Sequence, residues 1–163
     1  MKTNLNLGCG RRLIPSDDTT KWINVDFSIT ADLKHDLREI LPFDMNSIDY
    51  ILASHLAEHF SPYEWAKVKK DWYRVLKQGG RLEVRVPDLE YACREFLAGK
   101  KYFGMVSAHA MIYGSQEVEG QMHHQGFDKQ RLQEDLEQEG FKIKFCDNVP
   151  PVLWQIICIA EKI

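Results

Sequence analysis

The sequence of 163 residues lacks the features that mark several classes of protein. No apolar run approaches the roughly 20 residues of a membrane-spanning helix, and the first residues, MKTNLNLGCG, contain no apolar signal-peptide core. No long basic run occurs, and the net charge is −3, so neither nucleic acid nor a membrane is an expected partner. We therefore expect a cytoplasmic protein.

Cysteine is scarce, and no two cysteines form a Cys-x-x-Cys pair. The four are Cys9, Cys93, Cys146 and Cys158. Cys158 lies in an apolar stretch, where a thiol usually serves as a small hydrophobic group. A chain of this length buries roughly 70% of the surface that its unfolded form exposes. We therefore expect reduced thiols and one domain, residues 1–163, that needs no disulfide or metal for stability.

The hydrophobic pattern alternates between strand-like and helix-like stretches, which is typical of α/β proteins. It predicts a Rossmann-like, doubly wound sheet of about seven strands, mostly parallel, with helices on both faces and an antiparallel C-terminal strand. The last two strands pair as a hairpin around Pro150-Pro151. The predicted strands are 3–7, 22–26, 31–33, 49–54, 81–86, 142–147 and 154–161.

Three helices have recognisable ends. Ser61 and Glu64 form a capping box for the first, which Gly79-Gly80 ends. Asp88 caps the second, which Gly99 follows, and Asp128 starts the third, which closes at Gly140. The side chains expected to face inward are Trp65, Val68, Trp72 and Val75 in the first helix, Leu89, Cys93, Phe96 and Leu97 in the second, and Leu132 and Leu136 in the third.

Two features at the ends of the first strands predict a nucleoside site. Gly8-Cys9-Gly10 follows the first strand, where glycines let the backbone turn sharply against a ligand. Asp26 ends the second strand, where a carboxylate can accept both hydroxyls of a ribose. The third glycine of the dinucleotide fingerprint is absent, as is a Gly-Lys-Ser/Thr run, so we expect neither a dinucleotide nor a nucleoside triphosphate.

Several motifs agree with one family in a consistent order. LNLGCG, INVDFS, DLREILPFDMNSIDYILASHLAEHF and RVLKQGGRLEVRVPDLE resemble the class I S-adenosylmethionine-dependent methyltransferases of the small type 11 group, from Leu5 to about Glu90. The resemblance implies S-adenosylmethionine as the cofactor. It implies cofactor binding by Gly8, Gly10, Asp26, Asp36, Leu37, Ser54 and His55. Asn6, Cys9 and Phe27 are further candidates beside them.

The chain departs from that family at two places. Asn6 stands where many relatives have an acidic residue, and the connection from Gly10 to Trp22 has room for only a very short first helix, broken by Pro15. Both departures bear on how the methionine part of the cofactor is held. Phe27 either lies against the adenine ring or serves as a core aromatic.

The resemblance implies methyl transfer to an oxygen or nitrogen of a small acceptor, with a sugar or cell-surface glycan precursor as the family-level expectation. Glu58, His59 and His124 are the candidate catalytic residues, since a base removes the acceptor's proton; packing is the competing role of His59. The segment from 99 to 127 either covers the acceptor pocket or is a solvent-exposed loop. Its candidate substrate contacts are His109, Tyr113 and His123.

Two other functions remain open. One is a cofactor-binding module without catalysis, which Asn6 and the short first connection favour. The other is a zinc hydrolase, because His55-Leu56-Ala57-Glu58-His59 matches the inverted zinc-protease motif. That motif needs one unbroken helical turn, whereas here His55 follows a strand and the next helix starts only at Ser61. We expect no metal site, and either a monomer or a homodimer.

Overall fold

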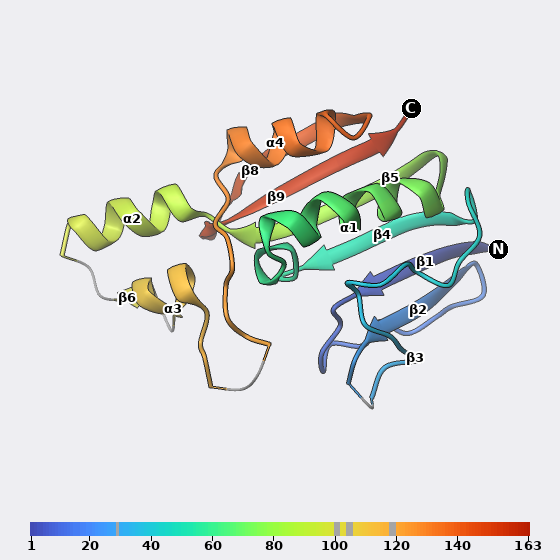
Figure 1. Cartoon of the computed structure of the whole chain (residues 1–163), viewed down its shortest axis with the longest axis horizontal. Coiled ribbons are helices and arrows are strands. Elements are labelled where there is room, and N and C mark those ends of the chain that lie inside the picture. The colour runs from blue at the N-terminus through green and yellow to red at the C-terminus, as the bar shows by residue number, and fades with distance from the viewer. Residues whose placement is uncertain (29, 100–101, 104–105, 118–119) are drawn as a thin grey trace.

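The computed structural model of the chain describes residues 1–28, 30–99, 102–103, 106–117 and 120–163. Its main sheet has seven strands in the order β3-β2-β1-β4-β5-β9-β8 (Figure 1). Their bounds are β1 Lys2–Leu7, β2 Thr20–Asp26, β3 Leu33–Lys34, β4 Ile48–Ser54, β5 Leu76–Pro87, β8 Phe141–Val149 and β9 Val152–Lys162. The predicted mostly parallel sheet with antiparallel C-terminal strands is confirmed.

The parallel strands end at a common edge. β1 pairs in parallel with β2 on one side and with β4 on the other, and β4 pairs in parallel with β5. β9 runs antiparallel to both β5 and β8. The strand order therefore reverses between β1 and β4, and α/β sheets bind ligands at such a switch point, beyond the carboxyl ends of the strands.

Helix α1 (Pro62–Val75) crosses from β4 to β5 and begins as predicted. The Ser61 hydroxyl accepts a hydrogen bond from the Glu64 amide at 3.3 Å, and the Glu64 carboxylate accepts one from the Ser61 amide at 2.8 Å. The predicted end of the helix is wrong, because α1 stops at Val75 and β5 starts at the next residue. Gly79-Gly80 lies inside β5, where the pairing with β4 shifts register. The glycines therefore shape a bulge in a strand.

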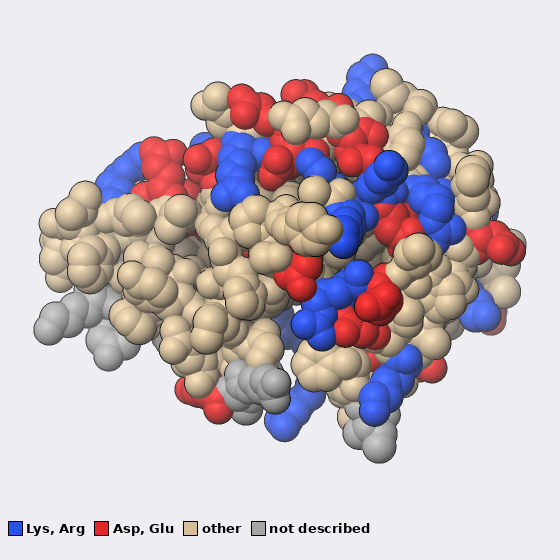
Figure 2. Space-filling view, in the orientation of Figure 1, with Lys and Arg blue, Asp and Glu red and all other residues tan. Residues whose placement is uncertain are grey.

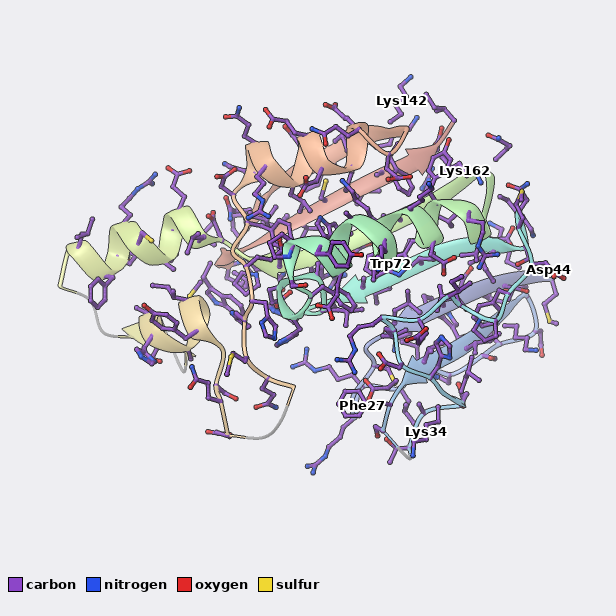
Figure 3. The ribbon with its side chains drawn as sticks, in the orientation of Figure 1. Phe27, Lys34, Asp44, Trp72, Lys142 and Lys162 are labelled. Carbon is purple, nitrogen blue, oxygen red and sulfur yellow. The ribbon has the colours of Figure 1, made fainter. Side chains whose placement is uncertain are left out.

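Helices α1 and α4 (Lys129–Glu137) lie side by side on one face of the sheet (Figure 1). Trp65 Nε1 donates to Asp135 Oδ2 at 3.0 Å, and Lys69 Nζ donates to Asp135 O at 2.7 Å. The inward faces predicted for both helices are buried, and Trp72 lies between α1 and the strands (Figure 3). This face holds the main core, with Leu5, Leu7, Val25, Ile51, Leu82, Val84, Ile156 and Cys158 from the sheet.

The opposite face of the sheet differs from the prediction. Within the described ranges no helix covers it, and the very short first helix is absent. Side chains hold the β1–β2 connection there instead: Asn6 Nδ2 donates to Arg12 O and to Asn24 Oδ1, both at 2.8 Å, and Ile14 N donates to Asn24 Oδ1 at 2.8 Å. Shallow hollows remain beside the connection, lined in part by Trp22, Tyr50 and Arg81.

Helix α2 (Leu89–Leu97) projects past the carboxyl edge of the sheet and packs against α3 (Ala108–Tyr113) (Figure 1). Asp88 caps it as predicted, but the predicted inward face is wrong: Cys93, Phe96 and Leu97 are exposed. The helix leaves the sheet too soon to bury that face, so only Ala92 is buried, in a small cluster with two residues of α3. Two short strands, β6 (Tyr102–Phe103) and β7 (Val106–Ser107), pair between α2 and α3.

Charged side chains are unevenly distributed over the face of the molecule that Figure 2 shows. Figure 2 shows basic and acidic side chains intermixed over α1, α4 and the strands, and a largely uncharged surface around α3. Among the described residues, no helix combines the length and apolar character needed to cross a bilayer.

Candidate active site

The glycine turn after β1 has a backbone shape that other residues rarely adopt. Gly8 has φ +66° and Gly10 has φ +50°. A Cβ on Gly8 would lie 2.9 Å from Leu56 Cδ1, whereas a Cβ on Gly10 would meet nothing within 4 Å. Gly8 therefore packs tightly against Leu56, and Gly10 faces open space. Burial, and after it the charge of Asp26, raises the pKa of the Cys9 thiol between them to about 11.

Asp26 connects this turn to the end of β2. Its Oδ2 accepts from the Gly10 amide at 3.0 Å, and its Oδ1 accepts from the Ser28 amide at 2.8 Å. Each oxygen retains acceptor capacity, because a carboxylate offers about four acceptor positions. Phe27, the next residue, is exposed and lies at the carboxyl end of β2 (Figure 3). A Cβ on Gly120 would lie 3.6 Å from its ring, so the segment before α4 reaches this point.

The other predicted cofactor positions differ in their surroundings. Asp36 is half-buried and forms an ion pair with Arg38 at 2.6 Å; this hydrogen-bonded contact lowers the pKa of Asp36. Leu37 is buried in the main core. The side-chain amide of Asn6 holds the β1–β2 connection, as described above, so Asn6 supports the glycine turn from behind.

His55 directly follows β4 and has the left-handed backbone value of φ +53°. This turn aims its ring away from Ser54, the last residue of the strand, and toward the start of β9. There Nε2 bonds to Gln155 Oε1 at 2.8 Å, and the ring lies 5.6 Å from that of Trp154. Burial by itself would lower the pKa of His55, but its contacts with Glu58 and Gln155 outweigh burial and raise it.

Glu58 is the most deeply buried charged residue of this region, with 1% of its surface exposed. It lies in η1, a short 3-10 helix of Ala57–His59. Residues 55–59 therefore lack the single α-helical turn of the zinc-protease motif, in agreement with the prediction. Neither carboxylate oxygen has a hydrogen-bond partner within the described part of the chain. His55 forms an ion pair with Glu58 when it is protonated, since its Nδ1 lies 3.4 Å from Oε1.

Two half-buried histidines flank this carboxylate. Nδ1 of His59 contacts Met122 O at 3.0 Å, and Nδ1 of His123 contacts Met111 O at 3.0 Å. The two rings pack edge to face with 5.0 Å between centroids. Burial lowers the pKa of His123, against an opposing effect of Glu58. One potential ligand atom from each of Glu58, His59 and His123 lies within 4.8 Å of the other two.

The sequence predicted no metal site, whereas this grouping brings together three residues that could hold a metal ion. That expectation considered carboxylates close to His123 in sequence, whereas Glu58 comes from a distant segment. A backbone hydrogen bond joins the two segments, because the His124 amide donates to Glu58 O at 2.9 Å. Gln125 adds a second connection, because its Nε2 donates to Phe60 O at 3.0 Å.

Three predicted residues lie outside the cluster. His124 takes part through its backbone only, and its side chain is exposed. His109 and Tyr113 are exposed on α3, where their rings lie 4.9 Å apart. Of the four histidine and tyrosine positions proposed for this segment, only His123 reaches Glu58.

Sequence reasoning missed Trp154 and Gln155, which contact His55. They lie at the start of β9, and its antiparallel direction brings that start to the carboxyl edge of β5, where Asp88 N donates to Trp154 O at 2.9 Å. The predicted hairpin contained this information, because an antiparallel last strand must begin at the edge where the parallel strands end.

The methyltransferase-domain family matches residues 5–84 of the chain, from β1 into β5. No functionally curated protein matches the sequence.

Solved structures match the fold over nearly the whole chain. An S-adenosylmethionine-dependent methyltransferase from Methanosarcina mazei is 17% identical with a TM-score of 0.70, over 99% of this chain and 92% of that one. A Burkholderia thailandensis 1,6-didemethyltoxoflavin-N1-methyltransferase, solved with 1,6-didemethyltoxoflavin and S-adenosylhomocysteine, is 16% identical with a TM-score of 0.67, over 98% and 70%. The cyclase SpnF is also 16% identical, with a TM-score of 0.65, over 99% and 75%. Such likeness shows the fold, and the reaction must be argued from the site.

Proposed function

From the premise that the chain is a class I S-adenosylmethionine-dependent methyltransferase, we propose that it methylates an oxygen or nitrogen of a small acceptor bound beside Glu58 and His59. The observation that carries the proposal is the position of two features at one switch point. The open glycine turn and Asp26 end β1 and β2, and the His55–His59 segment follows β4 directly beside them.

The cofactor's ribose hydroxyls bind to Asp26, whose oxygens keep acceptor capacity after bonding to the turn. The methionine part passes over Gly8 and Gly10 toward Ser54 and His55, in the space that a Cβ on Gly10 would enter. The adenine ring lies between Phe27 and the Asp36-Leu37 segment. Its recognition by Asp36 requires the carboxylate to exchange part of its contact with Arg38 for the ligand.

Methyl transfer is a direct displacement, so alignment of acceptor, methyl and sulfur is the main task of the enzyme. A lone pair of the acceptor atom forms the bond to the methyl carbon, and the carbon–sulfur bond breaks with its electrons going to sulfur. The acceptor's proton goes to His59 Nε2, because Nδ1 of that ring donates its hydrogen to Met122 O. The buried charge of Glu58 stabilises the imidazolium that results.

We propose a sugar, or a precursor of a cell-surface glycan, as the acceptor. The cluster offers imidazole nitrogens and a carboxylate, which suit an acceptor rich in hydroxyl groups. Beside it, the half-exposed Trp154 ring presents a flat apolar surface next to His55. Such aromatic rings combine apolar contact area with a polar edge.

Calorimetric titration with S-adenosylhomocysteine tests the cofactor site. Asp26→Asn should weaken binding roughly 10- to 150-fold, the equivalent of about 1.5–3 kcal/mol for a lost charged hydrogen-bond partner. Asp32→Asn is the matched control, because Asp32 also accepts a backbone amide nearby but bonds to Asn24. Equal affinities in wild type and folded Asp26→Asn would remove Asp26 from the site.

Turnover with a sugar acceptor tests the catalytic proposal separately. His59→Gln should keep the affinity for S-adenosylhomocysteine and lower turnover about 10²- to 10⁴-fold, as loss of a general base does. A loss of cofactor affinity with unchanged turnover at saturation would place His59 in the cofactor pocket.

A further inference from the structure

The buried carboxylate of Glu58 is incompletely partnered by the described residues. Only 1% of the residue is exposed, and neither oxygen accepts a hydrogen bond from the described residues. Buried charges in proteins are normally paired, hydrogen-bonded or bound to a metal. His55 pairs with Glu58 when it is protonated, since its Nδ1 lies 3.4 Å from Oε1, but this contact leaves Oε2 without a partner among the described residues.

One nitrogen from each of two imidazole rings lies within 4.8 Å of a Glu58 oxygen. His59 and His123 each use Nδ1 on a backbone carbonyl, Met122 O and Met111 O, at 3.0 Å. Each Nδ1 therefore carries the hydrogen in the neutral ring, and each Nε2 is left as a lone-pair donor. Metal-binding histidines show this pattern, because an outer carbonyl fixes the tautomer and the ring orientation.

The three residues are held by different parts of the fold. Glu58 and His59 lie in η1 after β4, whereas His123 lies in the segment between α3 and α4, which the His124 amide joins to Glu58 O at 2.9 Å. A packing role for His59 and His123 leaves the Glu58 oxygens unexplained, since neither oxygen accepts a hydrogen bond from the described residues.

We propose that Glu58, His59 and His123 bind one divalent first-row transition-metal ion, of the class of Zn²⁺, Mn²⁺, Fe²⁺ or Co²⁺. Two imidazoles and one carboxylate are a common protein ligand set for these ions. Metal–ligand bonds of about 2.0–2.2 Å place ligands about 3.3 Å apart in a tetrahedral site. The donor atoms, within 4.8 Å of one another, converge to that spacing by small side-chain rotations.

Three protein ligands leave at least one position on the ion open, which is the arrangement of catalytic rather than structural sites. The role of the ion rests on the proposed function: the open position takes the acceptor oxygen and lowers the pKa of its hydroxyl. The O–H proton then leaves to water, the oxygen lone pair forms the bond to the methyl carbon, and the carbon–sulfur electrons go to sulfur. In this form of the proposed function the ion, and not His59, activates the acceptor, because His59 is a ligand; the methyl transfer itself is unchanged.

Titration of the purified, chelator-treated chain with Co²⁺ and with Zn²⁺ tests the site without any cofactor or acceptor. We expect one Co²⁺ per chain, visible absorption bands from the bound ion, and displacement of Co²⁺ by Zn²⁺. His123→Ala and His59→Ala should each weaken binding at least tenfold, since mutations even in the outer shell cost 10- to 100-fold.

His124→Ala is the matched control, because His124 is the adjacent residue but its side chain is exposed. Wild-type affinity in His124→Ala with loss in His123→Ala supports the proposal. Equal losses in both variants, or no stoichiometric binding at millimolar Co²⁺, overturn it. Circular dichroism checks that each variant is folded, and Glu58→Gln provides a third ligand change. Metal binding without S-adenosylhomocysteine binding would refute the cofactor site while leaving the metal site standing.

Discussion

Gly8→Ala should mainly lower the stability of the chain, whereas Gly10→Ala should mainly weaken cofactor binding. Both residues have positive φ, of +66° and +50°, where a Cβ costs about 1–2 kcal/mol. Alanine recovers about 0.4–1 kcal/mol of this by restricting the unfolded chain. Backbone strain thus costs roughly 1 kcal/mol net in each variant.

Packing then separates the two variants. At Gly8 the new Cβ would lie 2.9 Å from Leu56 Cδ1, a side chain of the main core, and overpacking of this kind costs about 1–3 kcal/mol. Gly8→Ala should therefore destabilise the chain by about 2–4 kcal/mol. At Gly10 the Cβ would meet no atom within 4 Å, so the cost stays near 1 kcal/mol, or about 2–4 °C in the melting temperature.

The loss of cofactor affinity in the two variants should not follow their loss of stability. Gly10→Ala places a methyl group in the open space that we assign to the methionine part, so it should lose S-adenosylhomocysteine affinity despite its near-normal stability. Thermal melts and calorimetric titrations of both variants measure the two effects. Wild-type affinity in Gly10→Ala would refute the assigned cofactor path, and equal melting temperatures would refute the role of Leu56.

Two further predictions concern stability and thiol reactivity. Lys162 is buried near the end of α1 (Figure 3), where its ammonium group donates to backbone carbonyls. Lys162→Met should therefore lower the free energy of unfolding, measured in urea, by about 2–4 kcal/mol. Lys142→Met, at an exposed lysine, should change it little. Burial and the charge of Asp26 raise the pKa of Cys9 to about 11, so only about 0.1% of this thiol is ionised at pH 8. Iodoacetamide, with mass spectrometry as the readout, should therefore label the exposed Cys93 first. Preferential labelling of Cys9 in the folded chain would contradict this.

Local signals predicted the elements that depend on neighbouring residues. The capping box of Ser61 and Glu64 fixes the start of α1, and the helical spacing of Trp65 and Trp72 identifies its buried face. The end of α1 was not predictable in the same way. A double glycine serves equally as a helix terminator or as a bulge in a strand, and here the pairing of β5 with β4 decides between them.

The predictions for α2 and for the acceptor region required tertiary information. Phe96 and Leu97 have helical spacing, but α2 projects beyond the sheet and has no surface on which to bury them. Likewise, His123 and His124 are equivalent as sequence neighbours. The bond from the His124 amide to Glu58 O fixes the backbone so that His123 alone faces the carboxylate.

The glycine turn after β1 is held without a helix behind it. A pyrophosphate needs the positive end of a helix at such a turn, whereas S-adenosylmethionine has no phosphate. The turn still needs support, which Asn6 and Asn24 supply through side-chain amides and Asp26 through its carboxylate. Side-chain hydrogen bonds thus hold the turn in place of a helix, and Asp26 at the end of β2 adds a negative charge beside it.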